Sequence, residues 1–527
     1  MNWLERCLFP RSPWVNFLVI ACLSGALSFL LTGKQIYQAN WGLIDDHEVF
    51  YYLGSSLQLP ASDIWSTLLA KTEAGSLQGR FRPSYYFIKL IETSLWGENV
   101  HLWYLGHTIG FAIFLGSIWW TMHRFVGGWL SGSLTAYISL LPLWTGVWSR
   151  LGPSEIYGAA CVGVMVFAAD FLLLSERPRT RNACAILLTF ATIVLIGLKE
   201  TFIPLAGGPA AIFILVGIRK KLPPVLIGLL ALLIMACLGG LVFVVSRQVL
   251  AAGADYYANS VGPSRTLRFG ATGFLEAVLR TWWLYVIPIA FFQMLKVIPR
   301  KPIAAWIADS RVAVGAYGFL LISYAAQCAL YRSGFPQNNR YDFPAMLLVP
   351  LTCCILACEI SCKIRPLFPE RTVNRVQFAA AVFLLFALVP VYKAPPLIAA
   401  VRANIETTNL FHSELQRAVR AAEASPDAPI ILEAYGPGAY EAVFSLSYFM
   451  PALGARNRIS VRLHPDEKPD GKLDESLWQT LSRLEQKGSN TFTPLQSILA
   501  DNPKNCISIG INGSPDAGCS GFQVNSR

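Results

Sequence analysis

Residues 224–246, PVLIGLLALLIMACLGGLVFVVS, run for 23 positions without a charged side chain. A helix of about 20 predominantly apolar residues is long enough to cross the hydrocarbon core of a bilayer. Similar runs occupy much of the chain on both sides of this one. They lie near 15–33, 100–121, 126–147, 156–174, 183–198, 202–218, 276–295, 312–331, 343–360 and 377–392.

The composition of the whole chain agrees with this pattern. Apolar residues make up 54%, charged residues 14%, and the mean hydropathy is +0.46. Soluble domains carry about 25% charged residues, and a water-soluble α-helical protein of this length could not cover so much apolar surface. The sequence therefore predicts an α-helical polytopic membrane protein of about eleven transmembrane helices. The first run follows a short basic segment but is longer than a signal peptide core, which favours a retained helix.

Lysine and arginine are concentrated in alternate connections, and this bias predicts the orientation. The basic connections are short and hold, among others, Arg124, then Arg177, Arg179 and Arg181, then Arg219, Lys220 and Lys221, and later Lys363, Arg365, Arg371 and Arg375. The N-terminus is thus expected in the cytoplasm. With an odd number of spans, the C-terminal region is expected outside, and one span more or fewer would reverse that side. The net charge of +11 comes mostly from these residues and favours anionic lipid over nucleic acid as a partner.

The chain is expected to divide into a membrane core, residues 1–392, and an extracytoplasmic α/β domain, residues 393–527. The second part begins at a stiff Lys-Ala-Pro-Pro segment, 393–396, after which the composition becomes polar. Strands are predicted at 429–433, 458–463 and 505–511, and helices at 439–453 and 474–487. The glycines of 436–438 lack the spacing of a dinucleotide-binding loop. Cys506 and Cys519 both lie in this domain, where a disulfide between them could form and persist.

The first predicted external loop, 34–99, carries the most distinctive sequence, WGLIDDHEVFYY at 41–52. Asp45, Asp46, His47 and Glu48 are four adjacent ionisable residues between aromatic ones, and aromatic residues mark the headgroup level of a membrane. A carboxylate there can act as a general base, or several of these side chains can hold a divalent cation such as Mg²⁺ or Mn²⁺. The alternative is a solvated loop in which Asp46 caps a helix that starts at His47.

Basic residues recur beside aromatic ones on the same predicted side, where the positive-inside rule disfavours them. They are Arg80, Arg82, Arg150, Lys199, Arg265, Arg268, Arg280, Arg332 and Arg340, the last followed by Tyr341. Guanidinium groups donate paired hydrogen bonds to phosphate oxygens. Each could instead extend to the membrane surface or pair with a neighbouring acid such as Glu200. Together with the acids, they predict a site for an anionic lipid phosphate beside a carboxylate.

These features resemble the GT-C superfamily of integral-membrane glycosyltransferases. The resemblance rests on the many spans, the acids in the first external loop, the Arg340–Pro344 motif before a late span and the terminal α/β domain. It implies a polyprenyl-phosphate-linked sugar donor, a lipid-linked, glycan or protein acceptor, and a place in a bacterial inner membrane. Asp46 or Asp45 would be the base, and Arg80, Arg82, Lys199, Arg332, Arg340 and Tyr341 would bind the donor phosphate. The motif reads Asp-Asp-His-Glu where Asp-Glu is commonest in the family, and Phe50, four positions after Asp46, favours Asp46.

Two other classes of function fit parts of the pattern. A transporter or flippase for a lipid-linked or anionic substrate would also have many spans and basic residues. Transporters, however, often place charges near the midplane of repeated, broken helices, and the two halves of this sequence show no such symmetry. A non-catalytic glycan assembly protein would depend mainly on the C-terminal domain.

Overall fold

The computed structural model describes residues 12–43, 46–53, 57–72, 82–220, 223–250, 263–298, 305, 309–331, 340–391, 395–434, 439–463, 506–511 and 520–524. Within these ranges, eight helices are long and apolar enough to cross a membrane. They are α2 (Pro13–Thr32), α7 (Val100–Val126), α9 (Glu155–Leu174), α10 (Pro178–Ile196), α12 (Pro224–Leu250), α13 (Pro263–Met294), α15 (Arg311–Tyr331) and α16 (Leu348–Ile364). The chain is therefore a helical membrane-embedded protein, as its composition predicts.

The helices differ in how much of their surface faces outward. Half of the most apolar window of α7 is buried, because α2, α8 (Gly128–Ser139), α9 and α16 all pack against it. Only 17% of the corresponding window of α12 is buried, and its exposed side chains include Met235 and Val242. Lipid is the solvent that makes such an exposed apolar surface stable.

Eight of the eleven predicted spans coincide with these helices, including the short run at 183–198. The run at 126–147 instead forms α8 and a 3₁₀ helix, η4 (Pro142–Gly146), and the run at 202–218 forms η5 (Glu200–Ala206) and α11 (Gly207–Lys220). Proline at 142 and 204 removes a backbone donor and favours such breaks. The run at 377–392 lies in α17 (Glu370–Val391), which is not among the eight. The count of eleven, and the orientation that depends on it, stay predictions.

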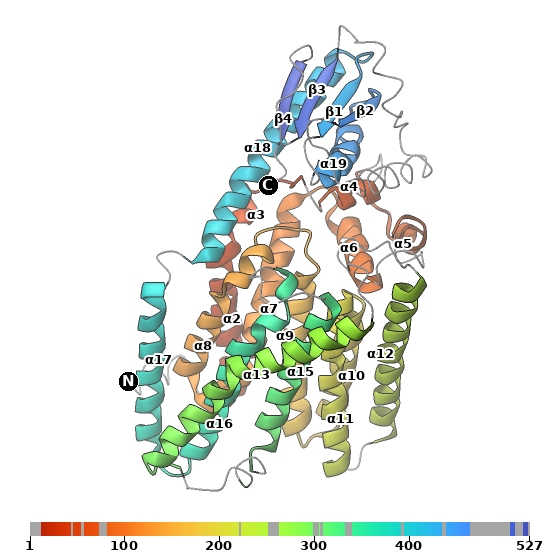
Figure 1. Cartoon of the computed structure of the whole chain (residues 1–527). Helices are drawn as coiled ribbons and strands as arrows, with labels where there is room; N and C mark the ends of the chain where they lie inside the picture. The colour runs from red at the N-terminus through yellow and green to blue at the C-terminus, as the bar shows by residue number, and fades with distance from the viewer. Residues whose placement is uncertain are drawn as a thin grey trace.

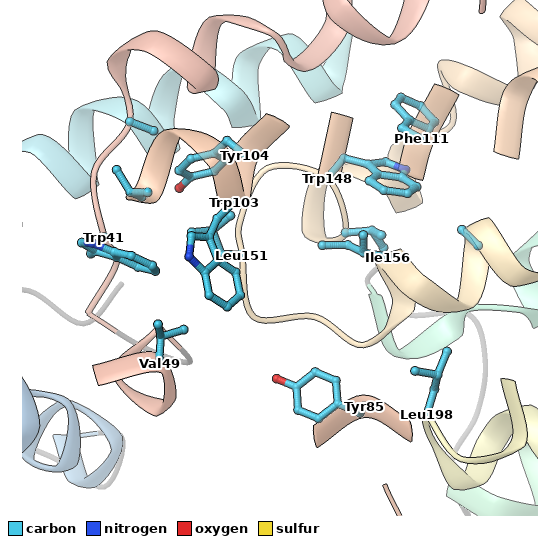
Figure 2. Packing of buried hydrophobic residues seen from close by; sticks show 14 of the residues in the cluster. Trp41, Val49, Tyr85, Trp103, Tyr104, Phe111, Trp148, Leu151, Ile156 and Leu198 are labelled. Atoms are coloured by element: carbon cyan, nitrogen blue, oxygen red, sulfur yellow. The ribbon is translucent and has the colours of Figure 1, made fainter. Parts of the chain in front are cut away.

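The predicted loop 34–99 is largely folded. It contains α3 (Lys34–Gln38), α4 (His47–Leu53), η2 (Ala61–Asp63), α5 (Ile64–Lys71) and α6 (Pro83–Trp96). Figure 1 places these short elements between the long helices and a β-sheet at the opposite end of the molecule. Part of the aromatic residues of the loop belongs to the main core, among them Trp41, Phe50 and Tyr85, whereas Trp65 is exposed. Trp41 meets Trp103 of α7 edge to face at 5.8 Å, and Figure 2 shows the two beside Leu151 and Tyr104.

The C-terminal part contains a four-stranded parallel sheet in the order β2-β1-β3-β4. The strands are β1 (Ile430–Ala434), β2 (Ile459–Leu463), β3 (Ile507–Ile511) and β4 (Ser520–Val524). The three predicted strands are confirmed, and β4 is additional. The helix predicted at 439–453 is α19 (Ala439–Ala452), whereas the one predicted at 474–487 lies outside the described residues.

A long amphipathic helix, α18 (Pro396–Ala424), leads from the helical bundle to this sheet (Figure 1). Its buried side chains, such as Leu415 and Val419, belong to the same hydrophobic cluster as Ile430 and Ile509 of the sheet. Its N-terminal half packs against α2, α3 and η4 of the bundle, and α19 packs against α4. The sheet is thus held against the 34–99 region from two directions.

Candidate functional site

Asp46 is buried, with 3% of its surface exposed, so it is not a residue of a solvated loop. Helix α4 begins at His47, directly after Asp46, as the capping alternative predicts. The carboxylate Oδ2 accepts a hydrogen bond from the backbone N–H of Gly42 at 2.6 Å. Phe50, one turn along α4, meets Trp41 edge to face at 5.2 Å. A short helix and a packed aromatic pair therefore fix this acid near the surface of the core.

The two residues that follow Asp46, His47 and Glu48, contact different helices. His47 Nδ1 lies 2.8 Å from the hydroxyl of Ser445 on α19, and its ring is stacked on Tyr448. Glu48 accepts a hydrogen bond from the Tyr85 hydroxyl at 3.2 Å. Within the described part of the chain, no group of three His, Cys, Asp or Glu side chains is arranged to hold a metal ion. Asp45, the fourth predicted metal ligand, lies outside that part.

The cationic candidates converge on a buried acid that the sequence analysis did not select. Lys199 forms an ion pair with Glu155 at the start of α9, and both side chains are nearly inaccessible to solvent. Arg340 also interacts electrostatically with Glu155. Arg82, at the N-terminus of α6, interacts with Glu200 and more weakly with Glu155. We call these five residues the charged cluster; it holds three cations and two carboxylates.

Burial and charge act in opposite directions on Arg82. Desolvation lowers its pKa, but the carboxylate of Glu200, with Tyr86, Tyr85 and Glu155, raises it, and the net effect is an increase. Arg82 is therefore a permanent cation at a partly buried position. Such a charge interacts more strongly with an anion than it would at the surface.

Three tightly packed elements position Arg340. Gln327 of α15 is fully buried; its Nε2 donates to Phe343 O at 2.9 Å, and its Oε1 accepts from Ala345 N at 2.8 Å. The Phe343 ring packs against Trp144 of η4 and Phe202 of η5. The 3₁₀ turn Arg340–Asp342 is thereby held between the ends of three helices.

Tyr85 connects the acidic and cationic groups. Its hydroxyl lies 3.2 Å from Glu48 Oε2 and 3.0 Å from Gly152 O, so the single proton is shared or alternates between the two acceptors. The Arg82 guanidinium lies over the Tyr85 ring at 6.0 Å. Ser84 and Tyr85 both donate backbone hydrogen bonds to Gly197 O, which ties α6 to the segment that carries Lys199. Glu48, of the acidic group Asp45–Glu48, and Arg82, of the charged cluster, therefore both contact Tyr85 at the start of α6.

The sequence prediction is thus resolved in part. The structure brings Arg82, Lys199 and Arg340 together and places Glu48 beside the same helix start. Arg80 and Arg332 lie outside the described residues, as does the side chain of Tyr341. Glu155 was missed, although its place after Pro153-Ser154 and before an apolar run is a signal for an acid at a helix start.

A second buried polar group was also missed. Lys89 of α6 is fully buried, donates to Leu151 O at 3.1 Å and lies over the Trp103 ring at 4.8 Å. One turn on, Glu92 accepts a hydrogen bond from the Tyr157 hydroxyl. Burial raises the pKa of Glu92 to about 7, against the opposing effects of Lys89 and Tyr157. The sequence analysis treated 34–99 as a loop, so it indicated neither helix α6 nor the covered face on which these residues lie.

The sequence matches no protein-family model, and no curated protein matches it either. The geometry by itself defines a helical membrane protein in which α4, with its acids, packs against α19 of the C-terminal part and a charged cluster lies at the starts of α6 and α9.

Proposed function

We propose that this protein is a membrane glycosyltransferase of GT-C type, which moves a sugar from a polyprenyl-phosphate carrier to an acceptor at the outer face of the inner membrane. The observation that carries the proposal is the position of Tyr85, which contacts Glu48 of the acidic group and lies beside Arg82 of the charged cluster. A site that transfers a group from a lipid phosphate needs a base and a phosphate-binding region next to each other.

In the proposed reaction, the Asp46 carboxylate accepts the proton of an acceptor hydroxyl. That oxygen forms a bond to the anomeric carbon of the sugar as the bond from this carbon to the phosphate oxygen breaks. The electron pair of the broken bond stays on the polyprenyl phosphate, which leaves as an anion. Arg82, Lys199 and Arg340 would stabilise this developing charge, with Arg80, Arg332 and Tyr341 as further proposed contacts.

Lys199 and Arg340 already interact with Glu155, which affects how they could serve this reaction. A carboxylate between cations holds their side chains in place before substrate binds and limits their mutual repulsion. Preorganised charge of this kind can contribute a few kcal/mol for each donor to the stabilisation of a transition state. A divalent cation such as Mg²⁺ or Mn²⁺, held by Asp45, Asp46, His47 or Glu48, would add positive charge beside the same acids and stays part of the proposal.

The cysteines support an outer location for the C-terminal part. Cys506, next to β3, is disulfide-bonded, whereas the nine cysteines described in the helical part are free. Disulfides persist in oxidising compartments outside the cytoplasm. The predicted partner of Cys506, Cys519, lies outside the described residues.

The proposal is tested with the double substitution of Asp45→Asn and Asp46→Asn. Transfer of labelled sugar from polyprenyl phosphate in isolated membranes should be lost, while expression and binding of the lipid donor remain. Asp63→Asn, which changes an exposed acid of the same region, is the matched control and should retain transfer. Undiminished transfer by the double variant would refute the proposed enzymatic role of the two acids. Movement of the lipid donor across the membrane of vesicles that contain this variant would identify a transporter instead.

A further inference from the structure

Helix α18 contacts the core through a row of polar residues rather than through apolar packing alone. Asn404 and Thr408 lie four positions apart, so they share one side of the helix, and the exposed Asn409 follows Thr408 directly. Thr408 is 2% exposed, and Asn404 is partly buried. A buried polar row on an otherwise amphipathic helix requires specific partners, because an unmatched polar group at such a contact is costly.

The Thr408 hydroxyl donates to Ile405 O of its own helix at 3.2 Å, and the other partners of this row belong to the region around Asp46. Thr408 Oγ1 accepts the backbone N–H of Asn40 at 3.2 Å, and Asn40 Nδ2 donates to Asn409 Oδ1 at 2.7 Å. Asn404 Nδ2 donates to the Tyr104 hydroxyl at 3.0 Å and lies 3.2 Å from Gln35 Oε1. Gln35 in turn donates to Trp148 O at 3.0 Å. One helix face thus holds segment 39–43 against α7 and the loop after η4.

Segment 39–43 is also the segment that holds Asp46. The Gly42 N–H donates to Asp46 Oδ2. Gly42 lies only two residues after Asn40, whose backbone N–H donates to Thr408. A Cβ at Gly42 would lie 3.1 Å from Asp46 Oδ2 and 3.8 Å from Thr408 Cγ2, so Gly42 is packed between the two. Tyr104, fixed by Asn404, interacts electrostatically with Asp46.

From these contacts we propose that Thr408 and Asn404 of α18 are positioning residues for Asp46, acting through Gly42 and Tyr104. They touch no reacting atom; they set the place of the carboxylate. Because α18 continues into the sheet, movement of the C-terminal part, for example when an acceptor binds there, would be transmitted to the base. The role in catalysis rests on the proposed function, whereas the structural coupling does not.

The coupling is tested by hydrogen–deuterium exchange of the purified full chain in detergent micelles. Thr408→Val keeps the shape of the side chain but removes the acceptor for Asn40 N–H, and should raise amide exchange in 39–43 and 46–53 by about tenfold. Thr408→Ser retains the hydroxyl and should restore slow exchange. Thr189→Val is the matched control, because the Thr189 hydroxyl bonds only a carbonyl of its own helix among the described contacts.

Exchange in 39–53 that is unchanged by Thr408→Val, or raised equally by Thr189→Val, would overturn the proposal. Asn404→Ala provides an independent route, and should loosen the same segment through Tyr104 if the Thr408 variant is poorly folded. In a transfer assay, Thr408→Val should lower kcat with little change in the KM for donor, and Thr408→Ser should recover it. If the wild-type chain transfers no sugar, the exchange result still decides the coupling, and the proposed function alone fails.

Discussion

The Lys199 ammonium and the Glu155 carboxylate form an ion pair in which each side chain is only 2–3% exposed. The two residues lie 44 positions apart and join the loop after α10 to the start of α9. Removing one partner of a buried pair leaves an uncompensated charge, whereas an exposed pair contributes little to stability.

Lys199→Met should therefore destabilise the protein by about 3–5 kcal/mol. The measurement is thermal unfolding in detergent. Arg280→Met, which breaks an exposed pair with Glu276, is the control and should cost under about 1 kcal/mol. The double variant Glu155→Gln with Lys199→Met should recover part of the loss. Equal effects of the Lys199 and Arg280 variants would show that the buried pair has no special role.

Arg340→Ala should raise the KM for the lipid-linked donor by about ten- to a hundredfold, because a charge-assisted hydrogen bond contributes roughly 1.5–3 kcal/mol. Arg340→Lys keeps the charge but loses the paired geometry and should be intermediate. Initial rates at varied donor concentration measure the effect, with Arg402→Ala on the exposed side of α18 as the control. A fall in expression with an unchanged KM would point to a structural role.

Gly158→Ala should disturb the support of Arg340. A Cβ at this position would lie 2.7 Å from the Phe202 ring and 3.3 Å from Phe343, both of which are buried. Overpacking of this kind costs about 1–3 kcal/mol. Gly110→Ala in α7 meets neighbours only at 3.9 Å or more, and it should be neutral or stabilising by up to about 1 kcal/mol, since alanine favours a helix. The melting temperature should therefore fall for Gly158→Ala and stay unchanged or rise for Gly110→Ala, and an equal fall in both variants would contradict the packing argument.

Stability should fall as the pH rises from 4.5 to about 7, because Glu92 keeps its proton in the folded state over this range but loses it when unfolded. The contribution of Glu92 to the free energy of unfolding is largest below pH 4.5, declines between pH 4.5 and about 7, and is constant above pH 7. The difference corresponds to roughly 3 kcal/mol. Glu92→Gln can still accept the Tyr157 hydroxyl and should remove this decline. Unfolding measured at pH 5 and pH 8 tests the prediction, which fails if the variant and the wild type show the same pH dependence.

The orientation can be measured with an impermeant thiol reagent. Ser413→Cys places a thiol on the exposed side of α18, and Glu176→Cys places one in the connection between α9 and α10. In spheroplasts, Ser413→Cys should react directly, and Glu176→Cys should react only after the membrane is disrupted. The wild-type chain, with its own cysteines, provides the background. The reverse pattern would place the C-terminal part in the cytoplasm.

The sequence predicted the helical elements well where the signal is local. The run at 224–246 is apolar all round and forms α12, and the alternation at 458–463 forms β2. At 126–147 and 202–218, where apolar composition continues, it did not show that the backbone is divided between an α-helix and a 3₁₀ helix. Hydropathy records which residues avoid water, not where a helix breaks. Helix α18 was not predicted, because its buried residues recur every three or four positions among polar ones and give no continuous apolar run.

The sequence by itself determined that the chain enters a membrane and that acids and arginines gather near its predicted outer surface, because these are properties of single segments. Only the tertiary structure decided which of these charges meet. Glu155 interacts with both Lys199 and Arg340. Thr408 accepts a hydrogen bond from Asn40, 368 positions away, in the segment that contacts Asp46. Such contacts depend on how helices cross and on which buried polar groups find partners, and both are settled when the whole chain packs.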